Sequence, residues 1–216
     1  MTQLLDSPEP EVYQGQFGEY TITDSDRAGV LAYRISLMVA ALTFAIGVGL
    51  ALWQGNNPTV QQALTPLYIC FSLVLGLSLA TIHIYLALLH RLLQLFWGIG
   101  GIAALVLATQ NSEPLALTIY NQPQTLFGLG FTFAALAGIY FKEAFCFNRL
   151  ETKFLTPLVP FLLLGHIAGV LSIYQEQFLL TVWAFLFLVF ASRKFFQPIP
   201  QDIGDKSVFE HLKSQH

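Results

Sequence analysis

Residues 66–108 read PLYICFSLVLGLSLATIHIYLALLHRLLQLFWGIGGIAALVLA and decide the fold. As one helix, rising about 1.5 Å per residue, this stretch would be about 64 Å long, roughly twice the hydrocarbon thickness of a bilayer. The chain must therefore reverse within it. His90, Arg91 and Gln94 are the polar residues available for a turn, so we expect one apolar helix before them and another after them.

The composition of the whole chain agrees with this reading. Hydrophobic residues make up 55% of the 216 residues and charged residues only 11%. Soluble domains average about 25% charged residues, so this chain lacks the polar side chains needed to cover a globule of its size. These proportions argue against a soluble enzyme, a disordered protein and a nucleic-acid-binding protein. They leave an integral membrane protein, whose first partner is the lipid bilayer.

A transmembrane helix needs about 20 mostly apolar residues, and six stretches of the sequence meet this requirement. They are residues 35–53, 66–89, 92–108, 124–141, 155–173 and 178–195. These stretches lack the alternation of polar and apolar residues that is typical of a transmembrane β-strand. The predicted fold is an all-α, polytopic transmembrane helix bundle with six spans.

The distribution of basic residues predicts how the spans are oriented. With six spans, all 10 Lys and Arg residues fall on one side of the membrane. The loops on the other side, residues 54–65, 109–123 and 174–177, contain no Lys or Arg. Cytoplasmic loops carry an excess of basic residues. Both termini are therefore predicted to be cytoplasmic, or stromal in a plastid.

The sequence divides into three segments around these spans. Residues 1–30 are acidic and polar and predict a mobile N-terminal arm, residues 31–196 form the six-helix transmembrane domain, and residues 197–216 form a short cytoplasmic tail. Ser25 or Asp26 is expected to cap the first helix. Within the tail, residues 205–213 are expected to form a short surface helix.

Small residues at helical spacing predict where the helices touch, because they allow backbones to approach closely in lipid. Gly98 and Gly101 lie on such a stripe in the third span, and Gly165 and Gly169 lie on one in the fifth. Helix packing is the simpler interpretation, and a substrate path lined by small residues is the alternative. The sixth span consists mostly of large apolar residues, which predicts a place at the periphery.

Apart from Arg193 and Lys194 at the end of the sixth stretch, the apolar stretches carry no Asp, Glu, Lys or Arg, and they show no motif of an intramembrane hydrolase or metalloprotease. Proton relays and ion-coupled transporters normally need such charged groups within the membrane. We therefore expect no catalytic residue, no metal site and no enzymatic activity.

Two histidines, His83 and His166, lie inside the predicted spans. They could form hydrogen bonds between helices, ligate a tetrapyrrole such as haem or chlorophyll, or belong to a proton or metal pathway. Their predicted depths differ by about 6 Å at the helical rise, which counts against both binding one haem. Hydrogen bonding is the simplest interpretation, so no cofactor is expected and a tetrapyrrole is the alternative.

Residues 142–153, KEAFCFNRLETK, form the predicted loop between the fourth and fifth spans. Charges of both signs alternate with aromatic residues. This pattern predicts either an interfacial turn with solvated charges or a docking surface for a partner protein. The candidate docking residues are Glu143, Phe145, Cys146, Phe147, Arg149 and Glu151.

The stretch IYFKEAFCFNR at residues 139–149 is followed by Glu151 and by LLGH at residues 163–166. In this pattern the chain resembles an uncharacterised family of integral membrane proteins from cyanobacteria and plastids, which is named only as a domain of unknown function. The resemblance covers residues 30–195. It implies a photosynthetic lineage and a thylakoid or plasma-membrane location, and it carries over no activity and no site residues.

These observations favour a non-enzymatic membrane protein that works by binding, as an accessory or assembly component of a larger membrane complex. A small-solute carrier or channel is the alternative, and it would show an internal polar cavity open to one side. A haem- or chlorophyll-binding protein that uses His83 or His166 is a further alternative. An accessory protein would instead expose residues 142–153 or the small-residue face of a helix.

Overall fold

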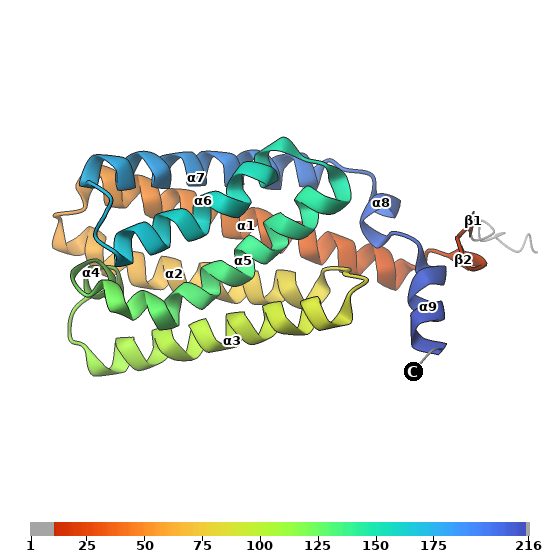
Figure 1. The fold of residues 1–216 in the computed structure, drawn as a ribbon, viewed down its shortest axis with the longest axis horizontal. Helices are drawn as coiled ribbons and strands as arrows, with labels where there is room; N and C mark the ends of the chain where they lie inside the picture. The colour runs from red at the N-terminus through yellow and green to blue at the C-terminus, as the bar shows by residue number, and fades with distance from the viewer. Residues whose placement is uncertain (1–10, 215–216) are drawn as a thin grey trace, which may run out of the picture.

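Six long helices form the body of the protein in the computed structural model, which describes residues 11–214. Consecutive long helices run in opposite directions, as Figure 1 shows. Their bounds are α1 Asp24–Gln54, α2 Pro58–Thr81, α3 Ala87–Gln110, α5 Leu126–Phe147, α6 Leu150–Ile167 and α7 Ile173–Phe195. Shorter elements are β1 Val12–Gln14, β2 Glu19–Thr21, α4 Leu115–Asn121, the 3-10 helix η1 Pro123–Thr125, α8 Ile199–Ile203 and α9 Lys206–Ser214.

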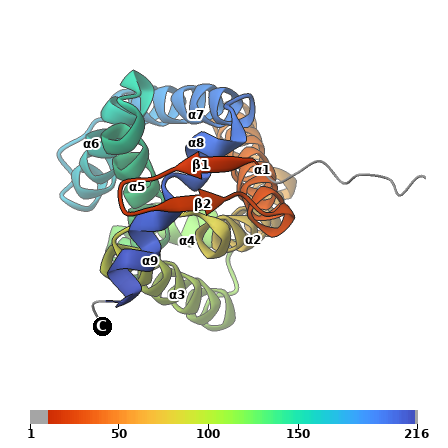
Figure 2. The same ribbon diagram turned by 90° about the vertical axis from the view of Figure 1, so that its right-hand side faces the viewer.

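The first and last described elements lie together at one end of the bundle, which we call the cap end (Figure 1). Seen along the bundle in Figure 2, β1, β2, α8 and α9 lie across this end. The turns between α1 and α2 and between α6 and α7 lie at the opposite end, together with α4. We call this opposite end the far end.

Three of the six long helices, α1, α2 and α7, begin with a side-chain cap. Thr23 and Asp26 form a capping box at the start of α1, in which Asp26 Oδ2 accepts a bond from the Thr23 amide at 2.8 Å. The cap is therefore Thr23 rather than Ser25 or Asp26. Asn57 caps α2, with Pro58 at the first helical position. Ser172 and Gln175 form a second capping box at the start of α7.

The turn between α2 and α3 lies at residues 82–86, which corrects the prediction of a turn at His90–Gln94. His90 and Gln94 instead lie on α3, where both side-chain nitrogens reach the Leu79 carbonyl oxygen, at 2.6 and 3.4 Å. The turn can be apolar because part of it is covered, although Leu86 is exposed. Ile84 is buried, and Tyr85 stacks on Phe209 of α9 with ring centroids 4.5 Å apart.

The main core lies between α1, α2, α5, α6 and α7, and its centre is aromatic. Trp183 of α7 lies 4.6 Å from Phe44 of α1 and 5.3 Å from Phe133 of α5, measured between ring centroids. Phe71 of α2 and Phe187 of α7 complete this group, which we call the aromatic layer. The prediction that the sixth span lies at the periphery is therefore wrong.

The most exposed long helix is α3. In its most apolar stretch of 18 residues, 17% of the residues are buried, against 33% in the corresponding stretch of α7. Its packed side faces α5, and a Cβ on Gly100 would collide with Thr132 there. At Gly98 and Gly101 a Cβ would meet no described atom within 4 Å. The prediction that these two glycines mediate helix packing within the chain is wrong.

The glycines predicted in the fifth span lie near the end of α6. A Cβ on Gly165 would collide with Leu171, which follows in the turn toward α7. Gly169 has a φ of 63°, which favours glycine and allows the chain to turn after α6. Both positions therefore serve the α6–α7 turn rather than a contact between separate spans.

The hairpin of β1 and β2 is tied to the C-terminal helix α9. Asp205 and Ser207 accept hydrogen bonds from the backbone amides of Gln16 and Phe17, at 2.6 and 3.0 Å. Residues 11–23 thus form a hairpin where the sequence predicted a mobile arm, while residues 1–10 lie outside the described part of the chain. The predicted surface helix at residues 205–213 is confirmed by α9.

Within residues 11–214, five helices are long and apolar enough to cross a membrane: α1, α2, α3, η1 with α5, and α7. The remaining long helix, α6, has 18 residues and carries Glu151 and Lys153 in its first turn and prolines at positions 157 and 160. The structure therefore supports an all-α polytopic bundle.

Candidate functional site

A cluster of buried charges lies at the cap end, where α1, α5, α7 and α8 meet. Glu143 and Lys194 are fully buried, with 0% of each side chain exposed. The sequence placed Glu143 in a loop, but α5 continues to Phe147 and ends at Asn148, which has a left-handed φ of 52°. The last turns of α5 and α7 thus carry charges beyond the apolar stretches and bring them together.

Glu143 is the centre of the cluster and is fully hydrogen-bonded. Its Oε1 accepts bonds from Lys142 Nζ at 2.9 Å and from the Tyr33 hydroxyl at 3.3 Å. Its Oε2 accepts a bond from Lys194 Nζ at 2.8 Å. A buried carboxylate is stable only when cations and donors replace water around it, and these contacts from α1, α5 and α7 provide that replacement.

Asp202 of α8 is the second carboxylate of the cluster. Its Oδ2 accepts a bond from Arg34 Nε at 2.7 Å, and its Oδ1 forms an ion pair with Lys194. Arg34 also donates to the backbone carbonyls of Phe195 and Pro198, at 3.4 and 3.2 Å, just beyond the end of α7. The short helix α8 is thereby fastened to α1 and α7.

Aromatic rings form the walls around Lys194. Its Nζ lies 4.1 Å from the centroid of the Phe147 ring and 5.7 Å from that of Tyr33. Lys142 Nζ lies 5.1 Å from the same Phe147 ring. The face of an aromatic ring attracts a cation, and more strongly where water is excluded. Phe147 therefore stabilises the ammonium groups rather than anchoring a loop in lipid.

Arg149 and Glu151 extend the cluster along the start of α6. Arg149 contacts Gln197 Oε1, and its NH1 lies 3.6 Å from Glu151 Oε1. Arg193 donates to Glu151 Oε2 at 2.7 Å. Among the described residues, Arg149 Nε and NH1 and Glu151 Oε1 are buried without a hydrogen-bond partner. A bridging water is the usual way to satisfy such groups.

The structure thus alters the prediction for residues 142–153. Phe145 is 83% exposed and Cys146 is also exposed, while Glu143, Arg149 and Glu151 point inward. The expectation of solvated charges is wrong, because α5 and α6 turn these side chains toward α7 and α8. Whether the stretch docks a partner stays a prediction, and Phe145 and Cys146 are the members of the set that a partner could reach.

The two predicted histidines lie at opposite ends of the bundle. His83 lies in the α2–α3 turn at the cap end, and His166 lies in the last turn of α6 at the far end. Burial lowers the pKa of His83. His166 Nδ1 lies 2.7 Å from Glu176 Oε1, beside the Tyr120 ring. A single haem could not bind both, and neither histidine lies deep in a span as predicted.

Within the described residues, no group of three His, Cys, Asp or Glu side chains could hold a metal ion. The buried cluster contains Lys and Arg at its centre, and cations repel a metal ion. The cluster is therefore an ion-pair network made of protein charges.

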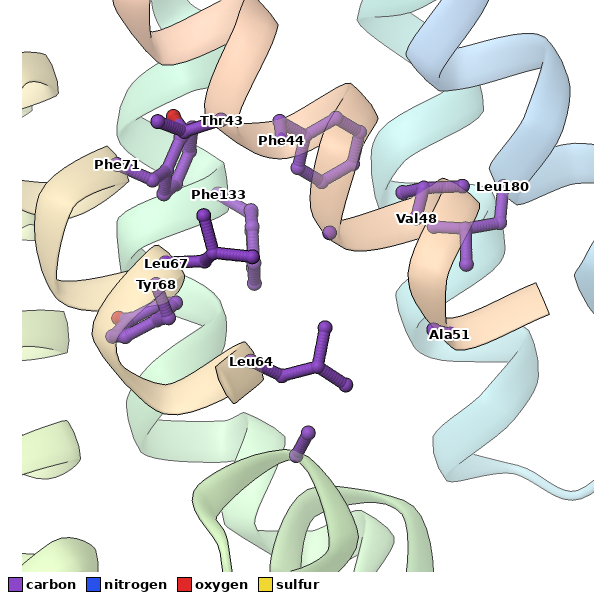
Figure 3. A pocket seen from close by; sticks show the side chains of 12 residues that line it. Thr43, Phe44, Val48, Ala51, Leu64, Leu67, Tyr68, Phe71, Phe133 and Leu180 are labelled. Atoms are coloured by element: carbon purple, nitrogen blue, oxygen red, sulfur yellow. The ribbon is translucent and has the colours of Figure 1, made fainter. Parts of the chain in front are cut away.

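An apolar cavity of about 190 Å³, open to the surface of the bundle, lies toward the far end. Figure 3 shows its lining from α1, α2, α5 and α7, with Phe44, Phe71 and Phe133 of the aromatic layer on one side. Tyr68 and Thr132 share a hydrogen bond of 2.9 Å at its wall. The aromatic layer lies between this cavity and the charge cluster. Its Trp183 donates a hydrogen bond to Tyr140, which lies on α5 one helical turn before Glu143 of the cluster.

The fold and the cluster together define a helical membrane protein closed at one end by buried ion pairs. The chain belongs to the family described as uncharacterized integral membrane protein (DUF2301), which matches residues 77–211. This match confirms the resemblance to an uncharacterised integral membrane family and places the protein in a membrane. It includes Glu143, Lys194 and Asp202. No curated protein and no solved structure shows a significant match to the chain.

Proposed function

We propose that this protein is a non-enzymatic accessory or assembly component of a membrane complex, and that another membrane protein binds along α3. The observation that carries the proposal is the open side of α3 at Gly98 and Gly101. Glycines in a membrane helix allow a second helix to approach closely, and α3 is the least buried long helix of the described chain.

Three neighbouring glycines of α3 provide a matched test. Gly98→Leu and Gly101→Leu add side chains at positions where a Cβ would meet no described atom of another part of the chain within 4 Å, so both variants should fold normally. Gly100→Leu would collide with Thr132 and should destabilise the protein. Thermal unfolding and the proteins that co-purify in mild detergent would be measured for each variant.

The accessory proposal predicts that stability and partner binding change separately in these variants. Gly98→Leu or Gly101→Leu should keep the wild-type melting temperature and lose a co-purifying protein. If both retain every partner of the wild type, α3 is not the binding surface. An absorption band in the purified protein that is lost in His83→Gln or His166→Asn would instead favour haem or chlorophyll binding.

We further propose six spans, with α6 as the fifth, and both termini in the cytoplasm. Arg27, Arg91 and Arg193 lie toward the cap end, as do the other basic residues, which supports a cytoplasmic cap. With Cys70 and Cys146 replaced, a cysteine at Asn57 should react with an impermeant reagent from outside. A cysteine at Gln201 should react only after permeabilisation, and the reverse pattern would overturn the orientation.

A small-solute carrier is the second candidate function, and the buried cluster favours it. Charged residues buried in a membrane protein commonly mark an ion or substrate path. The far-end cavity is apolar and is not the polar cavity expected of a carrier, so this candidate rests on the buried cluster alone. Proton flux into liposomes containing the wild type, absent with Glu143→Gln, would support the carrier; equal flux in empty liposomes would exclude proton transport.

A further inference from the structure

The C-terminal segment places a carboxylate among buried cations of the bundle. Arg34 and Lys194 are 6% and 0% exposed, and both contact Asp202. Gln197 Nε2 also donates to Asp202 Oδ1, at 3.3 Å. A guanidinium fork, an ammonium and an amide that converge on one carboxylate form the arrangement by which proteins recognise free carboxylate anions.

The segment that carries Asp202 is attached separately from the main core. The residues assigned to that core end at Ala191, before α8 begins. The apolar anchor of α8 is Ile203, which packs with Ile22 and Val30 in a small cluster of its own. Gly204, with a φ of 70°, follows α8 immediately. Release of α8 would therefore leave the packing of the long helices intact.

Release of α8 would also leave an excess of positive charge. Arg34, Lys142 and Lys194 would then face Glu143 alone, in a space walled by aromatic rings. An uncompensated buried cation is strongly destabilising, so the vacated position would attract an anion. Among the described residues, Asp202 is the carboxylate that reaches both Arg34 and Lys194.

We propose that Arg34, Lys194 and Gln197 form a binding site for a small carboxylate anion, which Asp202 occupies as a built-in ligand. The proposal does not depend on the accessory role. A tethered ligand has an effective concentration of about millimolar or more, so a free carboxylate must reach that range to displace α8. Displacement would leave α9 in place, because α9 is held separately by the 2.7 Å ion pair of Lys206 with Asp26 and by the stacking of Phe209 on Tyr85.

Chemical rescue of Asp202→Ala tests the site, with formate as the probe. The variant should melt below the wild type, and millimolar formate should raise its melting temperature more than chloride at equal ionic strength. Asp202→Asn, whose amide fills the space, should gain nothing from formate. Adding Arg34→Gln to Asp202→Ala should abolish the rescue. Asp26→Ala is the matched control, because it removes a carboxylate outside the site.

Hydrogen exchange of the full-length wild type provides a second test that does not require the variant to fold. Formate above millimolar concentration should speed the exchange of amides in α8 several-fold and leave the middle of α1 and α7 unchanged. The proposal is overturned if formate stabilises Asp202→Ala no more than chloride does. It is equally overturned if formate leaves the exchange of α8 in the wild type unchanged.

Discussion

At the cap end, α1, α5 and α7 contribute side chains to a cluster of buried ion pairs, and α8, α9 and the hairpin cover this end. At the far end, α1, α2, α5 and α7 instead surround an apolar cavity of about 190 Å³. The charge distribution accounts for this difference. The far-end loops contain no Lys or Arg, so a carboxylate there has only His166 within reach, as Glu176 shows.

This comparison connects membrane insertion to packing. Insertion favours basic residues on the cytoplasmic side, and an ion-pair network needs those same residues. The end of the bundle that carries the basic residues can bury several carboxylates in ion pairs, while the other end packs with apolar side chains. The contrast between the ends leads to four predictions, ordered from the largest expected effect to the smallest.

Removal of Glu143 should have the largest effect, because it leaves Lys142 and Lys194 buried without their shared carboxylate. We expect Glu143→Leu to reduce the free energy of unfolding by about 3–5 kcal/mol, measured by thermal or denaturant unfolding in detergent. Glu143→Leu combined with Lys194→Met should be more stable than Glu143→Leu alone. At the far end, Glu176→Gln should cost much less, since its side chain is 18% exposed. Equal losses at both ends would contradict the proposed contrast.

Arg149 and Arg193 test whether burial decides the value of an ion pair within the cap end. Both contact Glu151, but 10% of the Arg149 side chain is exposed against 58% for Arg193. Arg149→Ala should cost about 1.5–3 kcal/mol, typical of a buried bond to a charged group. Arg193→Ala should cost about 0–1 kcal/mol. If Arg149→Ala instead leaves the free energy of unfolding unchanged but loses a partner protein, the docking interpretation of residues 142–153 is restored.

Filling the far-end cavity should stabilise the protein. Ala51 lines the cavity, and Ala51→Leu should add about 1–2 kcal/mol by packing more apolar atoms against its lining. Ala40 is fully buried in the main core, so Ala40→Leu should instead overpack it and cost about 1–3 kcal/mol. Melting temperatures of the two variants give the comparison. Destabilisation by both would mean that the cavity cannot accept a side chain.

The smallest effect concerns pH and belongs to the cap end. Burial lowers the pKa of His83 in the folded protein, with Asp26, Lys142, Asp202 and Lys206 as the nearby charges. The unfolded chain then binds a proton more readily, so stability should fall as the pH decreases through about 6.5, the ordinary value for histidine. His83→Gln should flatten this part of the stability profile between about pH 5 and pH 7. An unchanged slope would assign the pH dependence to another group.

Local sequence patterns were enough for part of this structure. Composition and the length of apolar stretches predicted a polytopic helical membrane protein, and the spacing of residues 205–213 predicted α9. These features depend on the properties of neighbouring residues along the chain. The span boundaries were less accurate. Polar His90 and Gln94 suggested a turn, although α3 accommodates both by bonding them to the Leu79 carbonyl oxygen.

The charge cluster depended on tertiary structure. Lys142 and Glu143 lie just beyond one apolar stretch and Lys194 lies at the end of another, where the sequence predicts contact with water. Their burial requires residues distant in the chain: Arg34 and Asp202 are 168 positions apart and share a hydrogen bond. Likewise, Gly98 and Gly100 both lie in the same glycine-rich part of α3. Of these two, only Gly100 lies against a neighbouring helix, where an added Cβ would collide with Thr132. Periodicity identifies the sides of a helix, but the arrangement of the other helices decides which side is covered.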